Sequence, residues 1–232
     1  MENAKSANDT SRFTWRTFSE DLWLRQSRTI VAAAVVAVVA VAVWFAWSSV
    51  RDRRVDAENK QLGAAYILLR ENDPSAEQAL RGFLAQNPSG LARDKANLFL
   101  GKLLYRQERY DEALQAYEQV RAHGKTAPLI GSGALHGRAA IYMQKTDYAR
   151  AADLLDELVS TYGKRTGYPR DNISGEEVVD LSPNVPNALW KLALCRRALG
   201  DADKARTAAE RIVRAYPGTH EAQDAAKLLV TL

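Results

Sequence analysis

The sequence is poor in the residues that build active sites and metal centres. Its 232 residues contain one cysteine, Cys195, and three histidines. The histidines, His123, His136 and His220, are isolated, and no two stand at the spacing of paired metal ligands. The sequence also lacks a glycine-rich phosphate loop and a nucleophile motif. We therefore predict that the protein is not an enzyme and has no catalytic residue, metal site or cofactor.

A single cysteine excludes an internal disulfide and is compatible with either a reducing or an oxidising compartment. Cys195 lies among Leu192, Leu194 and Leu199 in a stretch with helical spacing. This neighbourhood predicts a small packing residue, and a reactive thiol is the alternative.

Strand patterns are also missing. After Arg51 no segment alternates apolar and polar residues with a period of two, and good helix formers dominate. These features predict an all-α fold. The net charge of +4 is spread along the chain without a basic stripe interleaved with aromatics, so we do not expect nucleic acid as a partner.

One long apolar segment stands out. Residues 29–50 carry no charge, and about 20 apolar residues of helix suffice to cross a bilayer. Trp44 and Trp47 near one end, with Trp23 beyond the other, suit the headgroup zones. We predict a polar N-terminal tail at 1–28, a transmembrane helix at 29–50 in contact with lipid, and a juxtamembrane linker at 51–58. The alternatives are a cleaved signal peptide and a buried core helix.

The charges do not give the membrane orientation. Arg25 and Arg28 precede the segment, while Arg51, Arg53 and Arg54 follow it. The positive-inside rule compares the lysines and arginines at the two ends, and here they are balanced.

A repeated pattern fills the rest of the chain. Ala79, Ala113, Ala151 and Ala205 each occupy the same place in a helical hairpin, and their spacings are 34, 38 and 54 residues. The first spacing is that of the tetratricopeptide repeat, and the other two add four and twenty residues where loops are expected. Small residues such as Gly101 should let paired helices cross closely.

These residues resemble the tetratricopeptide repeat family. The resemblance covers residues 59–232 and implies an α-solenoid of about four hairpins, closed by a capping helix after Tyr216-Pro-Gly. An inserted loop at 163–185 interrupts it, since Pro169, Pro183, Pro186 and several glycines disfavour a long helix there. Either the loop has a function or it is a decoration between two hairpins.

The resemblance also implies a binding surface. Repeats of this family bind protein along a concave groove formed by the first helix of each hairpin, and Trp190 lies near its centre. The matching positions, expected to contact a protein partner, are Lys102, Tyr105, Arg106, His136, Met143, Gln144, Trp190, Leu194 and Arg197.

A short tail, one span and then such repeats is similar to the layout of the ancillary subunit of the bacterial Sec translocon. The similarity implies a single-pass protein of the bacterial inner membrane, with a cytoplasmic N-terminus and periplasmic repeats. It also implies a scaffold or adaptor that assists protein translocation, folding or envelope assembly, with translocon, chaperone or envelope proteins as partners. The alternative is a structural scaffold that forms homo-oligomers, because alanines such as Ala33, Ala37 and Ala40 permit association of the apolar helix.

Overall fold

The computed structural model describes residues 15–121, 127–163 and 180–232. All regular secondary structure within these ranges is helical, which confirms the all-α prediction. The chain divides into two compact units, with the boundary between Val55 and Asp56. Helix α1, Trp15–Arg70, contributes to both units and has no break at 51–58, where the sequence predicts a linker.

The first unit contains the apolar part of α1. No side chain between Val31 and Val50 is buried, and Val38, Trp44 and Phe45 are each more than 60% exposed. This exposure argues against the alternative of a core helix, whose apolar side chains would be covered. Within the described residues this is the one helix whose length and composition allow it to cross a membrane, a property that signal sequences share.

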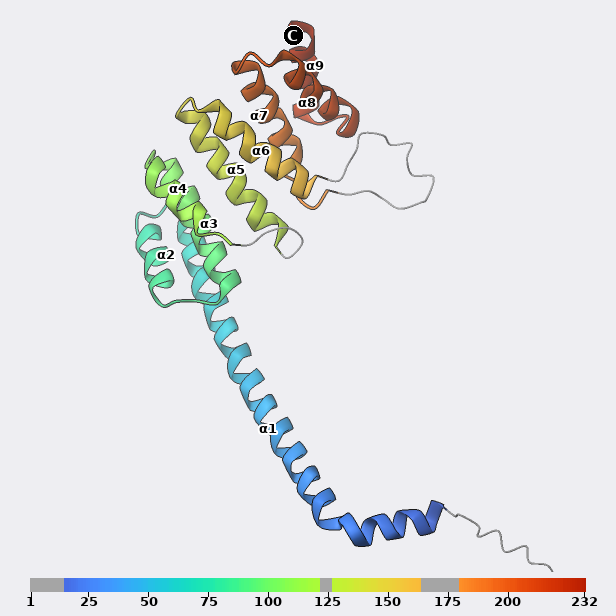
Figure 1. Cartoon of the computed structure of the whole chain (residues 1–232). Coiled ribbons are helices and arrows are strands. Elements are labelled where there is room, and N and C mark those ends of the chain that lie inside the picture. Colours follow the sequence, from blue (N-terminus) through green and yellow to red (C-terminus); the bar gives the residue numbers. More distant parts are fainter. Residues whose placement is uncertain (1–14, 122–126, 164–179) are drawn as a thin grey trace, which may run out of the picture. The chain divides into compact units, whose positions relative to one another are not determined.

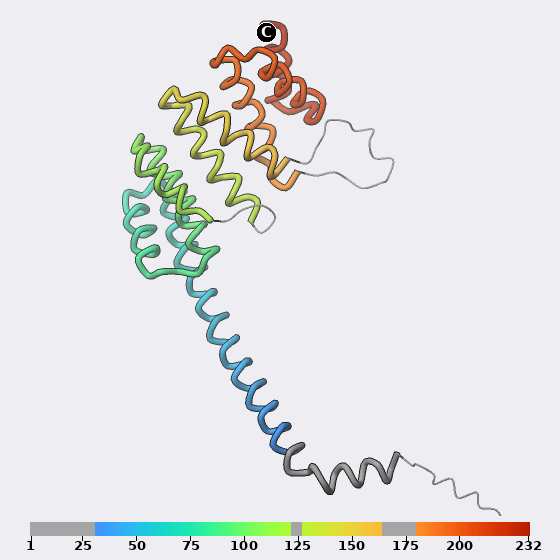
Figure 2. The backbone as a smooth tube through the Cα atoms, viewed as in Figure 1, coloured from blue at the N-terminus to red at the C-terminus, as the bar shows by residue number. Residues whose placement is uncertain are grey.

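The second unit is a series of helical hairpins. The final turns of α1, from Asp56, pair with α2, and then α3 with α4, α5 with α6 and α7 with α8, while α9 packs on α8 (Figures 1 and 2). The helices are α2 (Ala76–Ala85), α3 (Gly90–Arg106), α4 (Tyr110–Glu118), α5 (Pro128–Gln144), α6 (Tyr148–Tyr162), α7 (Val185–Ala198), α8 (Ala202–Ala215) and α9 (His220–Thr231).

The four turns inside the hairpins have the same geometry. Each contains one residue with positive φ, at Asn72, Glu108, Thr146 and Gly200. The next amide donates back to the carbonyl five residues earlier, as Asp147 N does to Tyr142 O at 2.9 Å. This is the Schellman arrangement, which ends the first helix and turns the chain into the second. The four turns therefore repeat one structural unit.

Close helix crossings depend on small residues. Ala113, Ala151 and Ala205 are fully buried at the fourth position of their helices, as the repeat pattern predicts. Ala79 holds the same position in α2 but is only partly buried, and Ala76 is fully buried instead. The first hairpin therefore packs with a different small residue from the others.

The predicted loop at 163–185 falls mostly outside the described residues, as do residues 122–126 between α4 and α5. The residues at the two ends of the loop lie together, because Leu181 N donates to Tyr162 O at 2.8 Å. Tyr216 Oη also donates to Asp180 Oδ2 at 2.6 Å. The repeat thus continues across the interruption, and α7 begins at Val185, the last residue of the predicted loop.

Candidate protein-binding face

The two helices of each hairpin differ in charge. Helices α3, α5 and α7, the first helices of the last three hairpins, carry eight lysines and arginines and one acidic residue, Asp94, which is buried. Helices α4, α6 and α8 carry five basic and eight acidic residues. We use the term first-helix face for the solvent-exposed surface formed by α1 (from Asp56), α3, α5 and α7. This face is basic, and it is the one that the sequence predicts to bind a partner.

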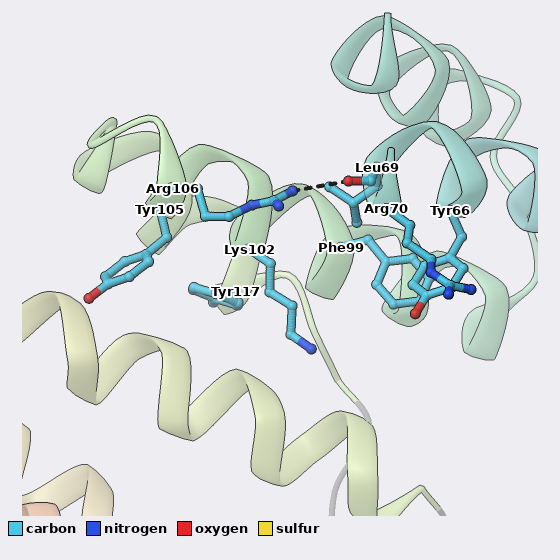
Figure 3. A pocket seen from close by; sticks show the side chains of 8 residues that line it. All are labelled: Tyr66, Leu69, Arg70, Phe99, Lys102, Tyr105, Arg106 and Tyr117. Carbon is cyan, nitrogen blue, oxygen red and sulfur yellow. Dashed lines mark hydrogen bonds between the residues drawn. The ribbon is translucent and has the colours of Figure 1, made fainter. Parts of the chain in front are cut away.

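A pocket of about 410 Å³ opens on this face between α1 and α3. Four of its eight lining residues are aromatic, three are basic and none is acidic. Tyr66, Phe99 and Arg70 gather on one side of the pocket, and Tyr105 and Arg106 lie on the other (Figure 3). The residues that line it are Tyr66, Leu69, Arg70, Phe99, Lys102, Tyr105, Arg106 and Tyr117.

Aromatic rings form much of the pocket wall. The Tyr66 and Phe99 rings pack with centroids 4.9 Å apart. Tyr117 is 3% exposed and lies between Gly101 of α3 and Gly137 of α5, where an added Cβ would come within 2.7 and 2.4 Å of its ring. Burial raises the pKa of Tyr117, so its hydroxyl stays protonated at neutral pH.

Within the part of the chain that the structure describes, the cations of the pocket have no carboxylate partner. Arg106 donates to two neutral oxygens, Asn72 Oδ1 at 2.8 Å and Leu69 O at 3.3 Å. Among the described residues, neither Arg70 nor Lys102 takes part in an ion pair. Their charges are therefore available to a ligand.

Basic residues elsewhere in the second unit often form ion pairs with carboxylates. Arg109 contacts Glu77 and Glu112 at 2.6 Å each, and these pairs hold the pKa values of both glutamates below their usual range. Arg196 of α7 pairs with Asp156 of α6. These ion pairs contrast with the pocket, where no carboxylate of the described residues neutralises the cations.

His136 of α5 lies in the middle of the first-helix face. Its Nε2 lies 2.9 Å from Asn187 Oδ1 of α7, and Asn187 Nδ2 donates to Glu221 Oε1 of α9 at 3.3 Å. Burial, and secondarily the charges of Lys191 and Lys102, lower the pKa of His136 to about 4. The imidazole is consequently neutral near pH 7 and connects α5 to α7.

The structure brings together some of the predicted site residues. Lys102, Tyr105 and Arg106 line the pocket, and Gln144 Nε2 donates to Tyr105 Oη at 3.4 Å. Met143 and Trp190 pack, partly buried, against the hydrophobic core of the C-terminal hairpins. Leu194 is half-buried and Arg197 exposed, and neither lines the pocket. The predicted set therefore spreads along the face instead of forming one cavity.

Five pocket residues were missing from the sequence prediction, namely Tyr66, Leu69, Arg70, Phe99 and Tyr117. A signal for two of them exists, because the turn residues Asn72 and Glu108 align the first two hairpins at an offset of 36. At that offset Tyr66 matches Lys102 and Arg70 matches Arg106. The weak first repeat concealed this correspondence.

Other chemistry is sparse in the described residues. Cys195 is fully buried, and burial raises the pKa of its thiol to about 11, so it behaves as the predicted packing residue. No group of three or more His, Cys, Asp or Glu side chains lies together as metal ligands would in this part of the chain.

Two family models described as tetratricopeptide repeat match the sequence. One covers residues 62–128 and 100–169, and the other covers residues 187–219, so that together they span more than half of the chain. This chain is a tetratricopeptide repeat protein. The matched segments contain the hairpins described above, which confirms the predicted type of repeat.

Solved structures share this fold. The crystal structure of MamA aligns with a TM-score of 0.53 and 18% sequence identity, over 72% of this chain and 82% of that chain. At such low identity the likeness concerns the fold alone, and it confirms a tetratricopeptide-like solenoid. A search of curated protein sequences gave no significant match.

Proposed function

We propose that this tetratricopeptide repeat protein is a membrane-anchored adaptor that binds a protein partner on its first-helix face. Tetratricopeptide repeats are protein-interaction modules, and stacked repeats offer an extended binding surface. The observation that carries the proposal is the pocket between α1 and α3, with its aromatic wall and its unpaired cations. Aromatic residues and arginines dominate the binding energy of many protein interfaces.

The anchor is residues 29–50 of α1. The exposed apolar side chains from Val31 to Val50 would be solvated by lipid tails, which removes their unfavourable contact with water. The layout of one span followed by repeats supports a place in the bacterial inner membrane, with a cytoplasmic N-terminus and periplasmic repeats. In that location the adaptor would assist protein translocation, folding or envelope assembly.

Partner binding is tested by affinity capture with the tagged full-length chain. The double variant Tyr66→Ser and Lys102→Ser removes an aromatic and a charged group that are both exposed, so the helices should remain folded. We expect recovery of the partner to fall at least about tenfold, as the loss of two interface contacts implies.

The matched control for this capture is Leu199→Ser with Arg206→Ser. It removes an exposed apolar side chain and an exposed cation at the α7–α8 turn and on α8, away from the first-helix face. We expect it to retain the partner. Equal recovery by both variants, with unchanged circular dichroism, would contradict the assignment of the binding face.

Topology is tested by thiol labelling of intact cells. Buried Cys195 is a poor target, so the experiment uses Cys195→Ala together with Asp153→Cys, at an exposed position on α6. A reagent that cannot cross the inner membrane should label this cysteine once the outer membrane is made permeable. Protection that lasts until the inner membrane is lysed would place the repeats in the cytoplasm.

A further inference from the structure

Given the proposed function, we propose that the pocket between α1 and α3 binds an acidic segment of the partner that carries one large apolar side chain. The apolar side chain would enter the pocket, and the carboxylates beside it would pair with Arg70 and Lys102.

The pocket has room for an apolar anchor. Its volume of about 410 Å³ exceeds that of any single side chain, and the exposed lining is mostly apolar. Tyr66 is 45% exposed although its ring already packs against Phe99, so a further hydrophobic partner can cover the remaining face. Burying such a ring stabilises a complex without a new charge.

The charges on the rim select for carboxylates. The three lining side chains that are charged at pH 7 are all cations. Two of them, Arg70 and Lys102, have no ion-pair partner among the described residues. Arg106 is fixed by Leu69 O and Asn72 Oδ1, both neutral, and so keeps its charge unbalanced. A basic partner segment would meet like charge there, which disfavours its binding.

The preference for carboxylates extends along the first-helix face. Lys102 and Lys191 both act electrostatically on His136, which places positive charge on either side of this residue. None of the residues of α5 or α7 is acidic. An extended acidic segment that starts in the pocket can therefore run toward α7 without meeting a carboxylate from those two helices.

The acidic second helices suggest a competing occupant, namely a second copy of this chain. Helices α4 and α6 each carry three acidic residues, and an exposed acidic surface could approach the basic face of another copy. That surface is helical and its carboxylates are partly paired, as Glu112 is with Arg109, so it cannot enter the pocket as an extended chain. We therefore favour a separate partner.

The test is a selection of random twelve-residue peptides displayed on phage against the full-length chain in lipid nanodiscs, after depletion on empty nanodiscs. We expect the enriched peptides to combine several Asp or Glu residues with one Leu, Phe or Trp. A synthetic peptide from the selection should bind about tenfold more weakly to Lys102→Glu and within about twofold of wild type to Arg206→Glu. Replacing its acids by amides should weaken binding to wild type by a similar factor.

The outcomes separate this inference from the proposed function. Enriched peptides that need Tyr66 and Lys102 but are not acidic would overturn the inference and leave the binding face intact. A selection without enrichment over empty nanodiscs would overturn both. If Lys102→Glu instead dissociates oligomers of the chain in sedimentation, the occupant is a second copy and the inference is wrong.

Discussion

At the residue scale, Tyr117 of the second hairpin joins it to the third hairpin. Its ring contacts the backbone of α3 at Gly101 and of α5 at Gly137, so one side chain of α4 fixes the spacing of two other helices. The repeat pattern predicts the close crossing at Gly101. It does not predict the one at Gly137, because that contact joins neighbouring hairpins and depends on their stacking angle.

Gly137→Ala should destabilise the second unit, the series of hairpins. The added methyl group would lie 2.4 Å from the Tyr117 ring, which cannot move away because it is buried on both sides. We expect a loss of about 2 kcal/mol, measured as the shift of urea unfolding followed by circular dichroism. Gly82→Ala in α2 is the control, since no atom lies within 4 Å of its added methyl, and it should stabilise by up to about 1 kcal/mol. Equal effects of the two substitutions would contradict the packing of Tyr117.

His136 should make stability depend on pH. Its pKa is lowered to about 4 in the folded chain, from an ordinary value of 6.5. Between these values the unfolded chain binds the proton that the folded chain excludes, so stability falls as the pH drops from 6.5 to 4. The contribution of this one residue is at most about 3 kcal/mol.

The measurement is the unfolding free energy of wild type and His136→Gln at pH 7 and pH 4.5. The glutamine can keep a hydrogen bond to Asn187 but does not titrate. Between pH 7 and pH 4.5 the variant should therefore lose less unfolding free energy than wild type does. Parallel pH profiles would show that other groups account for the acid sensitivity.

At the element scale, the helices follow from local sequence and their exceptions have local reasons. Good helix formers and Schellman turns define α3 to α8, and the sequence shows them as a repeated pattern. The continuity of α1 through 51–58 is not evident from the pattern, because a charged run after an apolar segment equally suits a linker. The burial of Ala76 in place of Ala79 likewise depends on how α2 packs against neighbouring helices.

Replacing residues 164–179 by two glycines should leave the fold intact. Tyr162 and Leu181 already meet through a backbone hydrogen bond, and Ser132 Oγ lies 2.7 Å from Ser182 Oγ, so the two ends are held without the intervening residues. We expect the free energy of unfolding, measured by urea titration, to stay within about 0.5 kcal/mol of the wild-type value. Loss of the helicity of α7 and α8 would show that the segment is part of the core.

At the scale of the whole molecule, each unit presents a different surface. The first exposes apolar side chains suited to lipid, and the second exposes a basic, aromatic face suited to an acidic protein segment. Sequence alone predicts the membrane-like segment and the repeat, because both depend on periodicity and composition. It does not predict the pocket, which needs Tyr66 and Phe99 from two helices to meet across a hairpin boundary.

The central claim is that a protein partner occupies the first-helix face. The most direct measurement places a photoreactive amino acid singly at Lys102, Gln144 and Arg197, and at the control positions Asp153, Arg206 and Gln223, all exposed in the full-length chain. We expect irradiation of living cells to give the same cross-linked partner from the first three positions and little or none from the controls. Cross-links of equal yield from both sets, or only from the controls, would contradict the claim.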